Sequence, residues 1–361
     1  MSPGINITSP RDGDVLTRHD GTETAEGLTL TVRGEAPGNG PIHVNGVPAT
    51  QEDNSFLCQV TLSDRHTSLV AETGEARDAI RVFWNQASRK RYRFSIDDNI
   101  CFLKDLATHP GRYASLFDHW YLGFWREMNK TFGAKIHINI YFQTDGFTLR
   151  QMPDIWKSEW QENASWLHLS FHALQDKPDR PYRNASYGQI AHDYDLVCGE
   201  IRRFAGEEVI TNTTTVHWAE CPKTAITALR DRGIENLIAL FDVQGYDGPC
   251  TTGYYLPREQ CAYCDTRGAW HDHETNLTFI RCTSVVNAVA LEAIPSTLDK
   301  RTATPHTAEM LELLIHEQYF RKELSYYQPT VLEKVKAALT WATDKGYEPV
   351  FWSEGFLGTT S

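Results

Sequence analysis

Two adjacent carboxylates stand at the end of an apolar run near residue 95. Residues 94–99 read FSIDDN, a pattern that predicts a buried strand ending at Asp97 and Asp98. Neighbouring side chains on a strand point to opposite faces, so both carboxylates face one site only where the chain turns. In that arrangement one carboxylate can bind a metal ion while the other accepts a proton. The alternative is a helix N-cap or a turn, where Asp is also common.

Two histidines further along the chain offer nitrogen ligands. His168 and His172 lie four positions apart in the segment WLHLSFH. On a helical turn this spacing places both imidazoles on one side, about 5–6 Å apart at Cβ, as a divalent cation requires. Imidazole suits zinc, iron, cobalt or nickel, and a carboxylate from elsewhere would complete a mixed nitrogen and oxygen site. The alternative is a pair of ordinary polar or packed histidines.

A third group of candidates lies around residues 213–220, which read TTTVHWAE. His217 and Glu220 could join a metal site or contact substrate, and Trp218 could line a substrate groove. The segment after His172 is expected to be a substrate-facing loop, in which Tyr182 and Arg183 are candidate contacts. The alternative is a polar strand end with ordinary hydrogen bonds, together with solvated arginines.

Taken in order, these motifs resemble those of the polysaccharide deacetylase family, the NodB-homology domain of carbohydrate esterase family four. That family has an Asp-Asp pair after its first strand and a His-(Ser/Thr)-x-x-His motif after a later one. The resemblance implies that Asp98, His168 and His172 hold a divalent metal ion and that Asp97 is the general base. It makes zinc the first expectation for the cofactor, with cobalt, nickel or iron as alternatives.

The resemblance continues toward the C-terminus, with one large departure. Residues 311–316 read LELLIH and are similar to the strand and histidine of the family's fifth motif, which implies that His316 is the general acid. The family's Arg-x-Pro-aromatic motif, whose arginine orients the base, has no counterpart in residues 213–220. Asp242 is expected to be a supporting carboxylate that holds the base or an imidazole.

The surrounding patterns predict two domains. Residues 1–88 read as short strands separated by turn signals such as Asn45-Gly46, which predicts an all-β, Ig-like sandwich of accessory role. In residues 89–361 strand and helix patterns alternate, which predicts an α/β domain with a parallel sheet or barrel. The resemblance implies a deformed (β/α)7 NodB-like barrel.

Apolar periodicity locates several helices in the second domain. It predicts them over residues 116–128, 193–204, 307–319 and 329–345. The third of these overlaps the segment in which the resemblance implies a strand. Periodicity and resemblance therefore make different predictions around His316.

Composition excludes several classes of partner. The 361 residues carry a formal net charge of −12, which repels phosphate backbones and anionic lipids, so nucleic acid is not expected as a partner. No run approaches the roughly 18–20 apolar residues of a membrane helix, so membrane insertion is not expected. The first residues lack a signal-peptide pattern. Location is then cytoplasmic, or extracellular or periplasmic if a signal was removed.

Four of the eight cysteines fall in one stretch of the second domain, namely Cys250, Cys261, Cys264 and Cys282. Cys261 and Cys264 have the Cys-x-x-Cys spacing of a zinc knuckle, but a matching second pair is missing. A structural zinc site, a disulfide and unlinked thiols therefore all remain open.

The sequence as a whole predicts a metal-dependent enzyme that removes N- or O-acetyl groups from a polysaccharide or oligosaccharide. The first alternative is metal-dependent cleavage of a glycosidic bond, by hydrolysis or elimination, which the missing arginine and the extra His217 and Glu220 motivate. The second is a glycan-binding protein without catalysis. The sugar, the linkage and the oligomeric state are not specified by these patterns.

Overall fold

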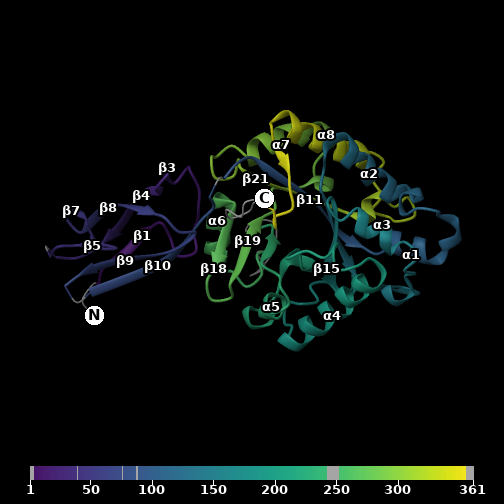
Figure 1. The fold of residues 1–361 in the computed structure, drawn as a ribbon, viewed down its shortest axis with the longest axis horizontal. Helices are drawn as coiled ribbons and strands as arrows, with labels where there is room; N and C mark the ends of the chain where they lie inside the picture. The colour runs from purple at the N-terminus through teal and green to yellow at the C-terminus, as the bar shows by residue number, and fades with distance from the viewer. Residues whose placement is uncertain (1–3, 39, 75, 87, 242–251, 355–361) are drawn as a thin grey trace. The chain divides into compact units, whose positions relative to one another are not determined.

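The structure is a computed structural model that describes residues 4–354 except 39, 75, 87 and 242–251 (Figure 1). The chain divides into two compact units. One contains the residues up to Arg89 together with Ala269–Asn276, and the other contains Lys90–Gly268 and Leu277–Ser353. The second unit carries every expected site residue that lies within the described part of the chain.

The N-terminal unit is built from two β-sheets. Its strands are β1 (Asn6–Ser9), β2 (Val15–Leu16), β3 (Gly21–Thr24), β4 (Gly27–Glu35), β5 (His43–Val44), β6 (Val47–Pro48), β7 (Thr50–Glu52), β8 (Ser55–Leu62), β9 (His66–Thr73) and β10 (Ala76–Trp84). One sheet has the order β1-β4-β8-β7, with β3 paired to β4, and the other has the order β2-β10-β9-β5-β6. Alternate residues of β8 are buried, and apolar side chains from both sheets form one cluster. The unit is therefore all-β, and an Ig-like topology stays a prediction.

The Asn45-Gly46 turn shows how sequence fixes a connection in this unit. Strands β5 and β6 pair across it, His43 with Pro48 and Val44 with Val47. Asn45 and Gly46 both have positive φ angles, 49° and 79°. A two-residue type I′ hairpin needs two such residues, and Asn-Gly adopts them at low cost.

The remaining strands form two main sheets in which most of the pairings are parallel. They are β11 (Arg91–Asn99), β12 (Ile136–Tyr141), β13 (Gln143–Thr144), β14 (Phe147–Thr148), β15 (Leu167–Ala173), β16 (Thr213–Thr214), β17 (Asn236–Ala239), β18 (Ala269–Asp272), β19 (Leu277–Arg281), β20 (Ser284–Val285), β21 (Met310–His316) and β22 (Glu348–Pro349). One sheet has the order β15-β12-β11-β21-β20, with β22 beside β11, and the other has the order β16-β17-β19-β18. The ladders of β11 with β12 and β21, of β12 with β15 and of β17 with β16 and β19 are all parallel.

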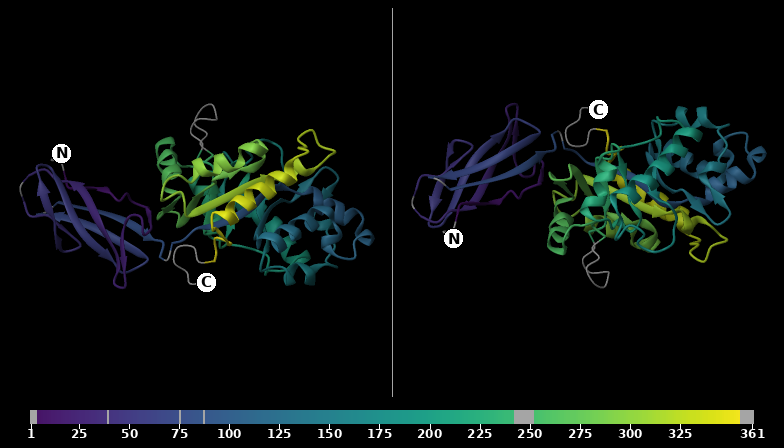
Figure 2. Two further views of the ribbon diagram at one scale, coloured as in Figure 1. Left: turned by 90° about the horizontal axis from the view of Figure 1, so that it is seen from above. Right: turned by 90° about the horizontal axis from the view of Figure 1, so that it is seen from below.

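Helices alternate with these strands and lie around them in Figures 1 and 2. They are α1 (Cys101–Thr108), α2 (Trp120–Phe132), α3 (Lys157–Glu162), α4 (Tyr187–Phe204), α5 (Lys223–Arg230), α6 (Arg258–Arg267), α7 (Ile294–Arg301) and α8 (Val331–Asp344). Among the described residues, none of these helices is long and apolar enough to cross a bilayer. The α/β class agrees with the sequence prediction, whereas closure of the two sheets into a seven-stranded barrel stays a prediction.

The helix predicted over residues 307–319 is wrong. Most of that segment is the strand β21, in which every residue except His316 is buried. A strand covered on both faces reads as a continuous apolar run, which periodicity alone does not separate from a buried helix. The strand implied by the resemblance is the one observed.

Parallel strands bring their C-terminal ends to one edge, which is where sites gather in α/β folds. Asp97 and Asp98 lie at the end of β11, His172 lies at the end of β15, and His316 is the last residue of β21. His217 follows β16 by three residues and opens the short 3₁₀ helix η4 (His217–Ala219). The topology therefore collects carboxylates and imidazoles from four separate segments.

Candidate metal centre

The chain turns at the acidic pair. The β11–β12 pairing shifts register between Ile96 and Asn99, and Asp98 has a left-handed φ of 62°. A bulge of this kind inserts a residue and redirects the side chains beside it. The side-chain amide of Asn99 holds the turn, since its Nδ2 lies 2.7 Å from the carbonyl oxygen of Ile96 and 3.1 Å from that of Asp97. The condition under which both carboxylates can serve one site is therefore met.

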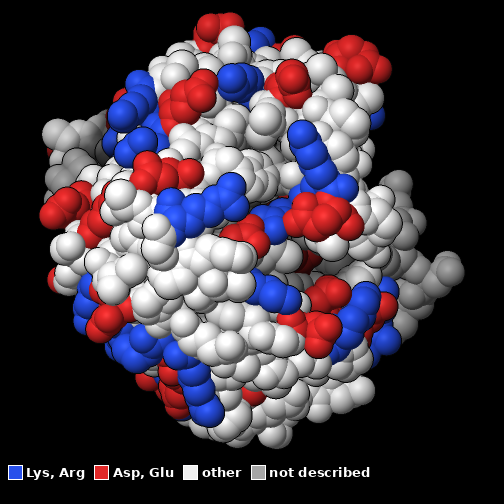
Figure 3. Space-filling view, turned by 90° about the vertical axis from the view of Figure 1, so that its right-hand side faces the viewer, with Lys and Arg blue, Asp and Glu red and all other residues white. Residues whose placement is uncertain are grey.

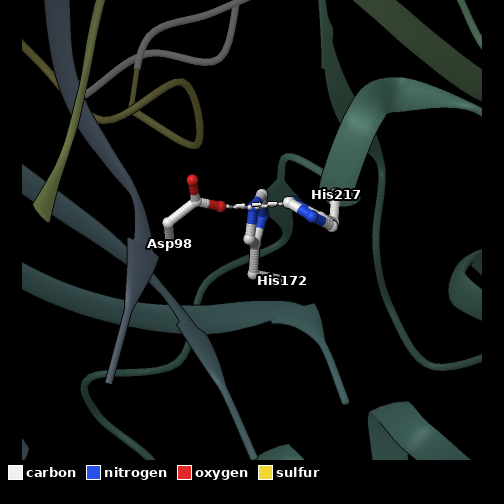
Figure 4. Close-up of side chains that lie close together, drawn as sticks. All are labelled: Asp98, His172 and His217. Carbon is white, nitrogen blue, oxygen red and sulfur yellow. Dashed lines mark hydrogen bonds and ion pairs between the residues drawn. The ribbon is translucent and has the colours of Figure 1, made fainter. Parts of the chain in front are cut away.

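Asp98, His172 and His217 bring three ligand atoms together (Figure 4). Asp98 Oδ1 lies 3.0 Å from His172 Nε2 and 3.2 Å from His217 Nδ1. The two imidazole nitrogens are 3.1 Å apart. With metal–ligand distances of about 2.1 Å, adjacent ligands are about 3.0 Å apart in an octahedral site and about 3.4 Å apart in a tetrahedral one. The spacing therefore fits three ligands on one face of an octahedron.

Both imidazoles are oriented by backbone carbonyl groups. His172 Nδ1 lies 2.5 Å from the carbonyl oxygen of Thr215, and His217 Nε2 lies 3.2 Å from that of Asp176. Each carbonyl accepts the N–H of its imidazole, so the other ring nitrogen presents a lone pair to the centre. Metal-binding histidines are typically held in this way. The donor set therefore fits a divalent cation in tautomer as well as in spacing.

Two neighbours hold the Asp98 carboxylate. Gln318 Nε2 donates a hydrogen bond to Asp98 Oδ2 at 2.7 Å, which leaves Oδ1 facing the imidazoles. The hydroxyl group of Tyr141 donates to Asp98 Oδ1 and lies 3.1 Å from His217 Nδ1. Burial, together with the charge of Asp98, raises the pKa of Tyr141 well above its usual range. Tyr141 is therefore neutral and serves as a hydrogen-bond donor at this site.

The charges at the centre favour a bound cation. Burial opposes ionisation of Asp98, but the adjacent imidazoles of His172 and His217 outweigh it and hold the pKa of this carboxyl well below its usual value. Burial also opposes the charged form of His172, but Asp97 and Asp98 outweigh it and raise the pKa of this imidazole. Asp98 is thus a carboxylate at neutral pH, as a metal ligand must be.

His168 does not lie at this centre, which corrects its expected role as a ligand. Residues 168–172 form part of β15, not a helical turn, and His168 pairs in register with His137. At about 3.3 Å per residue, four residues of strand separate the two histidines by about 13 Å. The ring of His168 stacks on Phe351 with centroids 3.6 Å apart. His217 supplies the second imidazole instead.

The expected base and acid lie beside the centre. Asp97 and His316 are register partners on the adjacent strands β11 and β21. Asn139 Nδ2 donates a hydrogen bond to Asp97 Oδ1 at 2.6 Å, while Asp97 Oδ2 has no partner among the described residues. His316 Nδ1 lies 2.9 Å from Asn287 Oδ1. Each group is therefore held at one atom, which leaves Asp97 Oδ2 and His316 Nε2 for chemistry.

The segment after His172 is organised differently from the sequence expectation. Tyr182 is fully buried, donates a hydrogen bond to Asp193 Oδ2 at 2.9 Å and accepts one from the amide of Leu174 at 2.9 Å. Tyr182 therefore fixes the loop to the interior of the protein. Because its side chain is not accessible, the structure contradicts a role for Tyr182 in binding substrate. Arg183 donates two hydrogen bonds of 3.1 Å to Glu220, a carboxylate only 7% exposed. Glu220 thus joins this loop to the segment after β16.

Trp218 follows His217 in an uncommon conformation. Its φ angle is 67°, and such backbone in a bulky residue is strained. The guanidinium of Arg180 lies over its ring, 5.1 Å from the centroid. The turn directs His217 into the centre and leaves the partly exposed indole beside it, which keeps a substrate contact by Trp218 as a proposal.

The cysteine-rich stretch adds no second metal centre among the residues the structure describes. Cys261, Cys264 and Cys282 are buried. Among the described residues, the group of Asp98, His172 and His217 is the metal-ligand cluster. Asp242 and Cys250 lie outside the described residues.

Figure 3 shows one face of the molecule, which is hollowed near its centre, with acidic and basic side chains mixed around the hollow.

Sequence reasoning missed four side chains that position the site: Asn139, Tyr141, Asn287 and Gln318. Asn139 carries the clearest signal, because it is a polar residue in the middle of the apolar run IHINIY of β12. Buried amides in a central strand need partners, and such partners are often functional groups. The other three depend on contacts between distant segments and have no local signature.

Comparisons with known proteins give distant similarities. No protein-family model and no curated protein matches this sequence. A 4-alpha-glucanotransferase structure from Thermococcus litoralis has a TM-score of 0.48 at 10% identity, over 74% of this chain and 40% of that one. A family 4 acetyl xylan esterase from Clostridium thermocellum, with cobalt, has a TM-score of 0.37 at 11% identity, over 74% and 90% of the two chains. The carbohydrate deacetylase Agd3 has a TM-score of 0.37 at 9% identity, over 94% and 68%. Function is therefore argued from the site itself.

Proposed function

We propose that the protein is a metal-dependent, NodB-like carbohydrate deacetylase that removes N- or O-acetyl groups from a polysaccharide or oligosaccharide. The observation that carries this proposal is the convergence of Asp98, His172 and His217 beside a held carboxylate, Asp97. A mixed site of two imidazoles and one carboxylate suits zinc first, and also iron, cobalt or nickel. When bound, the cation supplies Lewis acidity to an acyl carbonyl group and makes water more acidic.

Asp97 acts as the general base in this proposal. Its Oδ1 is fixed by Asn139, and its Oδ2 takes a proton from the water whose oxygen attacks the acetyl carbonyl carbon. The buried position of Asp97 keeps bulk water away from the transferred proton.

His316 acts as the general acid. Its Nδ1 is held by Asn287, whose own carbonyl oxygen accepts hydrogen bonds of 3.1 Å from Gln328 and from the buried ammonium of Lys334. Nε2 then donates a proton to the sugar nitrogen or oxygen as its bond to the acetyl carbon breaks. The products are acetate and the free amine or hydroxyl group of the sugar.

Product analysis tests this assignment directly. The purified protein, supplied with zinc, is incubated with N- and O-acetylated oligosaccharides, and acetate and chain length are both measured. We expect acetate with unchanged chain length, and a loss of about 10²-fold or more in rate for Asp97→Asn and for His316→Ala. His192→Ala is a matched control, since that imidazole is 68% exposed. Shorter oligosaccharides without acetate would replace deacetylation with glycosidic cleavage.

Glycosidic cleavage has lost part of its motivation. It was motivated by the missing arginine together with His217 and Glu220, and the structure pairs Glu220 with Arg183. Both carboxylate oxygens of Glu220 accept hydrogen bonds from this guanidinium, so the group is already engaged within the fold. We therefore propose deacetylation alone.

A further inference from the structure

A row of aromatic rings begins beside His316. Tyr319 lies in the short helix η7 (Glu317–Phe320), with its ring centroid 6.0 Å from that of His316. Tyr326 follows at 6.1 Å from Tyr319. Tyr326 is 57% exposed, so an apolar ring face stands open to water at the end of the row. Neither ring is used by the chemistry proposed above.

The segment that carries this row is held in place. The amide of Gln328 donates a hydrogen bond of 2.9 Å to the carbonyl oxygen of Tyr319, which closes the loop between them. Lys334 Nζ donates to Gln328 Oε1 at 2.8 Å, and this ammonium is buried. A loop tied at both ends presents its rings at lower entropic cost than a free one. The row is therefore a preformed surface.

The segment that carries this row also reaches the candidate metal centre. Gln318, the neighbour of Tyr319, contacts Asp98 through Oδ2, whereas the imidazole of His217 contacts Asp98 through Oδ1. The same segment begins directly after His316, the group that protonates the released sugar atom in the proposed function. The row of tyrosines is therefore connected to the proposed acid and to the carboxylate of the centre through one short segment.

We propose that Tyr319 and Tyr326 form a subsite that stacks on the sugar next to the one being deacetylated. This inference rests on the proposed function. The sugar that loses its acetyl group must lie at His316, so a neighbouring sugar of the same chain extends over the tyrosines. The C–H face of a pyranose is apolar, and aromatic rings bury such a face well. The subsite favours oligosaccharides of two or more units over a monosaccharide.

Relative rates on short and long substrates test this subsite. The probes are N-acetylglucosamine and tetra-N-acetyl-chitotetraose, with an O-acetylated xylose and xylotetraose pair as the second set. We expect Tyr326→Ala to lower the tetramer-to-monomer ratio of kcat/KM about tenfold, the effect of losing one stacked ring. Tyr326→Phe keeps the ring and should keep the ratio. Tyr187→Ala is the matched control, since Tyr187 is also an exposed tyrosine, 42% exposed, on α4.

Binding separates a failure of the subsite from a failure of the proposed function. The tetramers are titrated by NMR into Asp97→Asn and into the Asp97→Asn, Tyr326→Ala double variant. We expect Kd to be about tenfold higher in the double variant. If the Kd values differ in this way while the native protein releases no acetate, the result supports the subsite and contradicts the proposed deacetylase activity. Equal Kd values for both variants, or no binding of either tetramer by Asp97→Asn, would overturn the subsite.

Discussion

At the scale of single residues, a neutral amide holds the candidate base. The deacetylase motifs that the sequence resembles place an arginine in this role, and this chain has none in residues 213–220. Asn139, on the neighbouring strand β12, donates a hydrogen bond of 2.6 Å to Asp97 Oδ1. The amide fixes one oxygen of the carboxylate and adds no formal charge beside it.

Removal of that amide should impair catalysis more than binding. We expect Asn139→Ala to lower kcat about 10- to 100-fold with little change in KM, as for other groups that orient a reacting residue. The measurement is the steady-state rate of acetate release, with a thermal melt to show that the variant is folded. An unchanged kcat in a folded variant would mean that Asp97 needs no such support.

The residue scale also shows the reach and the limits of sequence reasoning. The motifs predict Asp98 and His172 as ligands, and both lie in the candidate metal centre. For His217 the sequence leaves open a role at the metal site or in substrate binding, and the structure places it in the same cluster. The prediction for His168 was wrong because residues four positions apart are about 5–6 Å apart at Cβ on a helix but about 13 Å apart along a strand. The choice between them depended on packing on both faces of β15, which the local sequence does not encode.

At the scale of elements, the helix that follows the acidic pair is capped from a distant segment. Helix α1 has no side-chain N-cap of its own. The buried carboxylate of Glu317 accepts hydrogen bonds of 2.8, 2.8 and 2.7 Å from the amides of Ile100, Cys101 and Phe102. Because Gln318 is the next residue, the same turn holds both the helix start and Asp98. The element that ends β21 is thus tied to the element that follows β11.

Loss of this cap should destabilise the protein. We expect Glu317→Ala to lower the free energy of unfolding by about 2–4 kcal/mol, since three backbone amides, two of them buried, lose their acceptor. Urea unfolding measures the change, with Glu333→Ala on the exposed face of α8 as the control. A loss for Glu317→Ala no larger than that of the control would contradict the capping role.

Elements with one exposed face were the easiest to predict from sequence. The alternating pattern of β8 and the Asn45-Gly46 hairpin matched their structures. The strand β21 did not, because burial on both faces removes the alternation. The bulge at Asp98 was stated only as a condition for function, since a one-residue shift of register leaves no mark on the apolar pattern.

At the scale of the whole molecule, one short segment of the later chain belongs with the N-terminal unit. Ala269–Asn276 is grouped with the residues up to Arg89. The amide of His271 donates a 2.8 Å hydrogen bond to the carbonyl oxygen of Gly13, and His273 Nε2 lies 2.9 Å from that of Arg81. The sequence assigned residues 89–361 to one domain, because a contact between segments so far apart has no signature in composition.

This segment carries a pH-dependent contribution to stability. Burial, with His273 and His66 nearby, lowers the pKa of His271 to about 3. Its usual value is about 6.5, so the unfolded chain binds a proton that the folded chain excludes between these two pH values. The stabilisation is present above pH 6.5 and is lost as the pH falls toward 3, at about 1.4 kcal/mol per pH unit.

Urea unfolding between pH 7 and pH 4 measures the contribution of His271 to the free energy of unfolding. We expect the free energy of unfolding of the native protein to fall with pH more steeply than that of His271→Phe, which cannot take up a proton. His192→Phe, at an exposed position, should follow the native curve. Parallel curves for the native protein and His271→Phe would show that His271 is not excluded from protonation by the fold.

Metal content of three variants is the most direct measurement on the central claim. After equilibration with zinc and removal of loose ions, we expect one ion per chain in the native protein and in His168→Ala, and none in His217→Ala. Removal of the ion by a chelator should also lower the thermal stability of the native protein, because an ion bound only by the folded state stabilises it. One zinc ion per chain in His217→Ala, together with none in His168→Ala, would contradict the site formed by Asp98, His172 and His217.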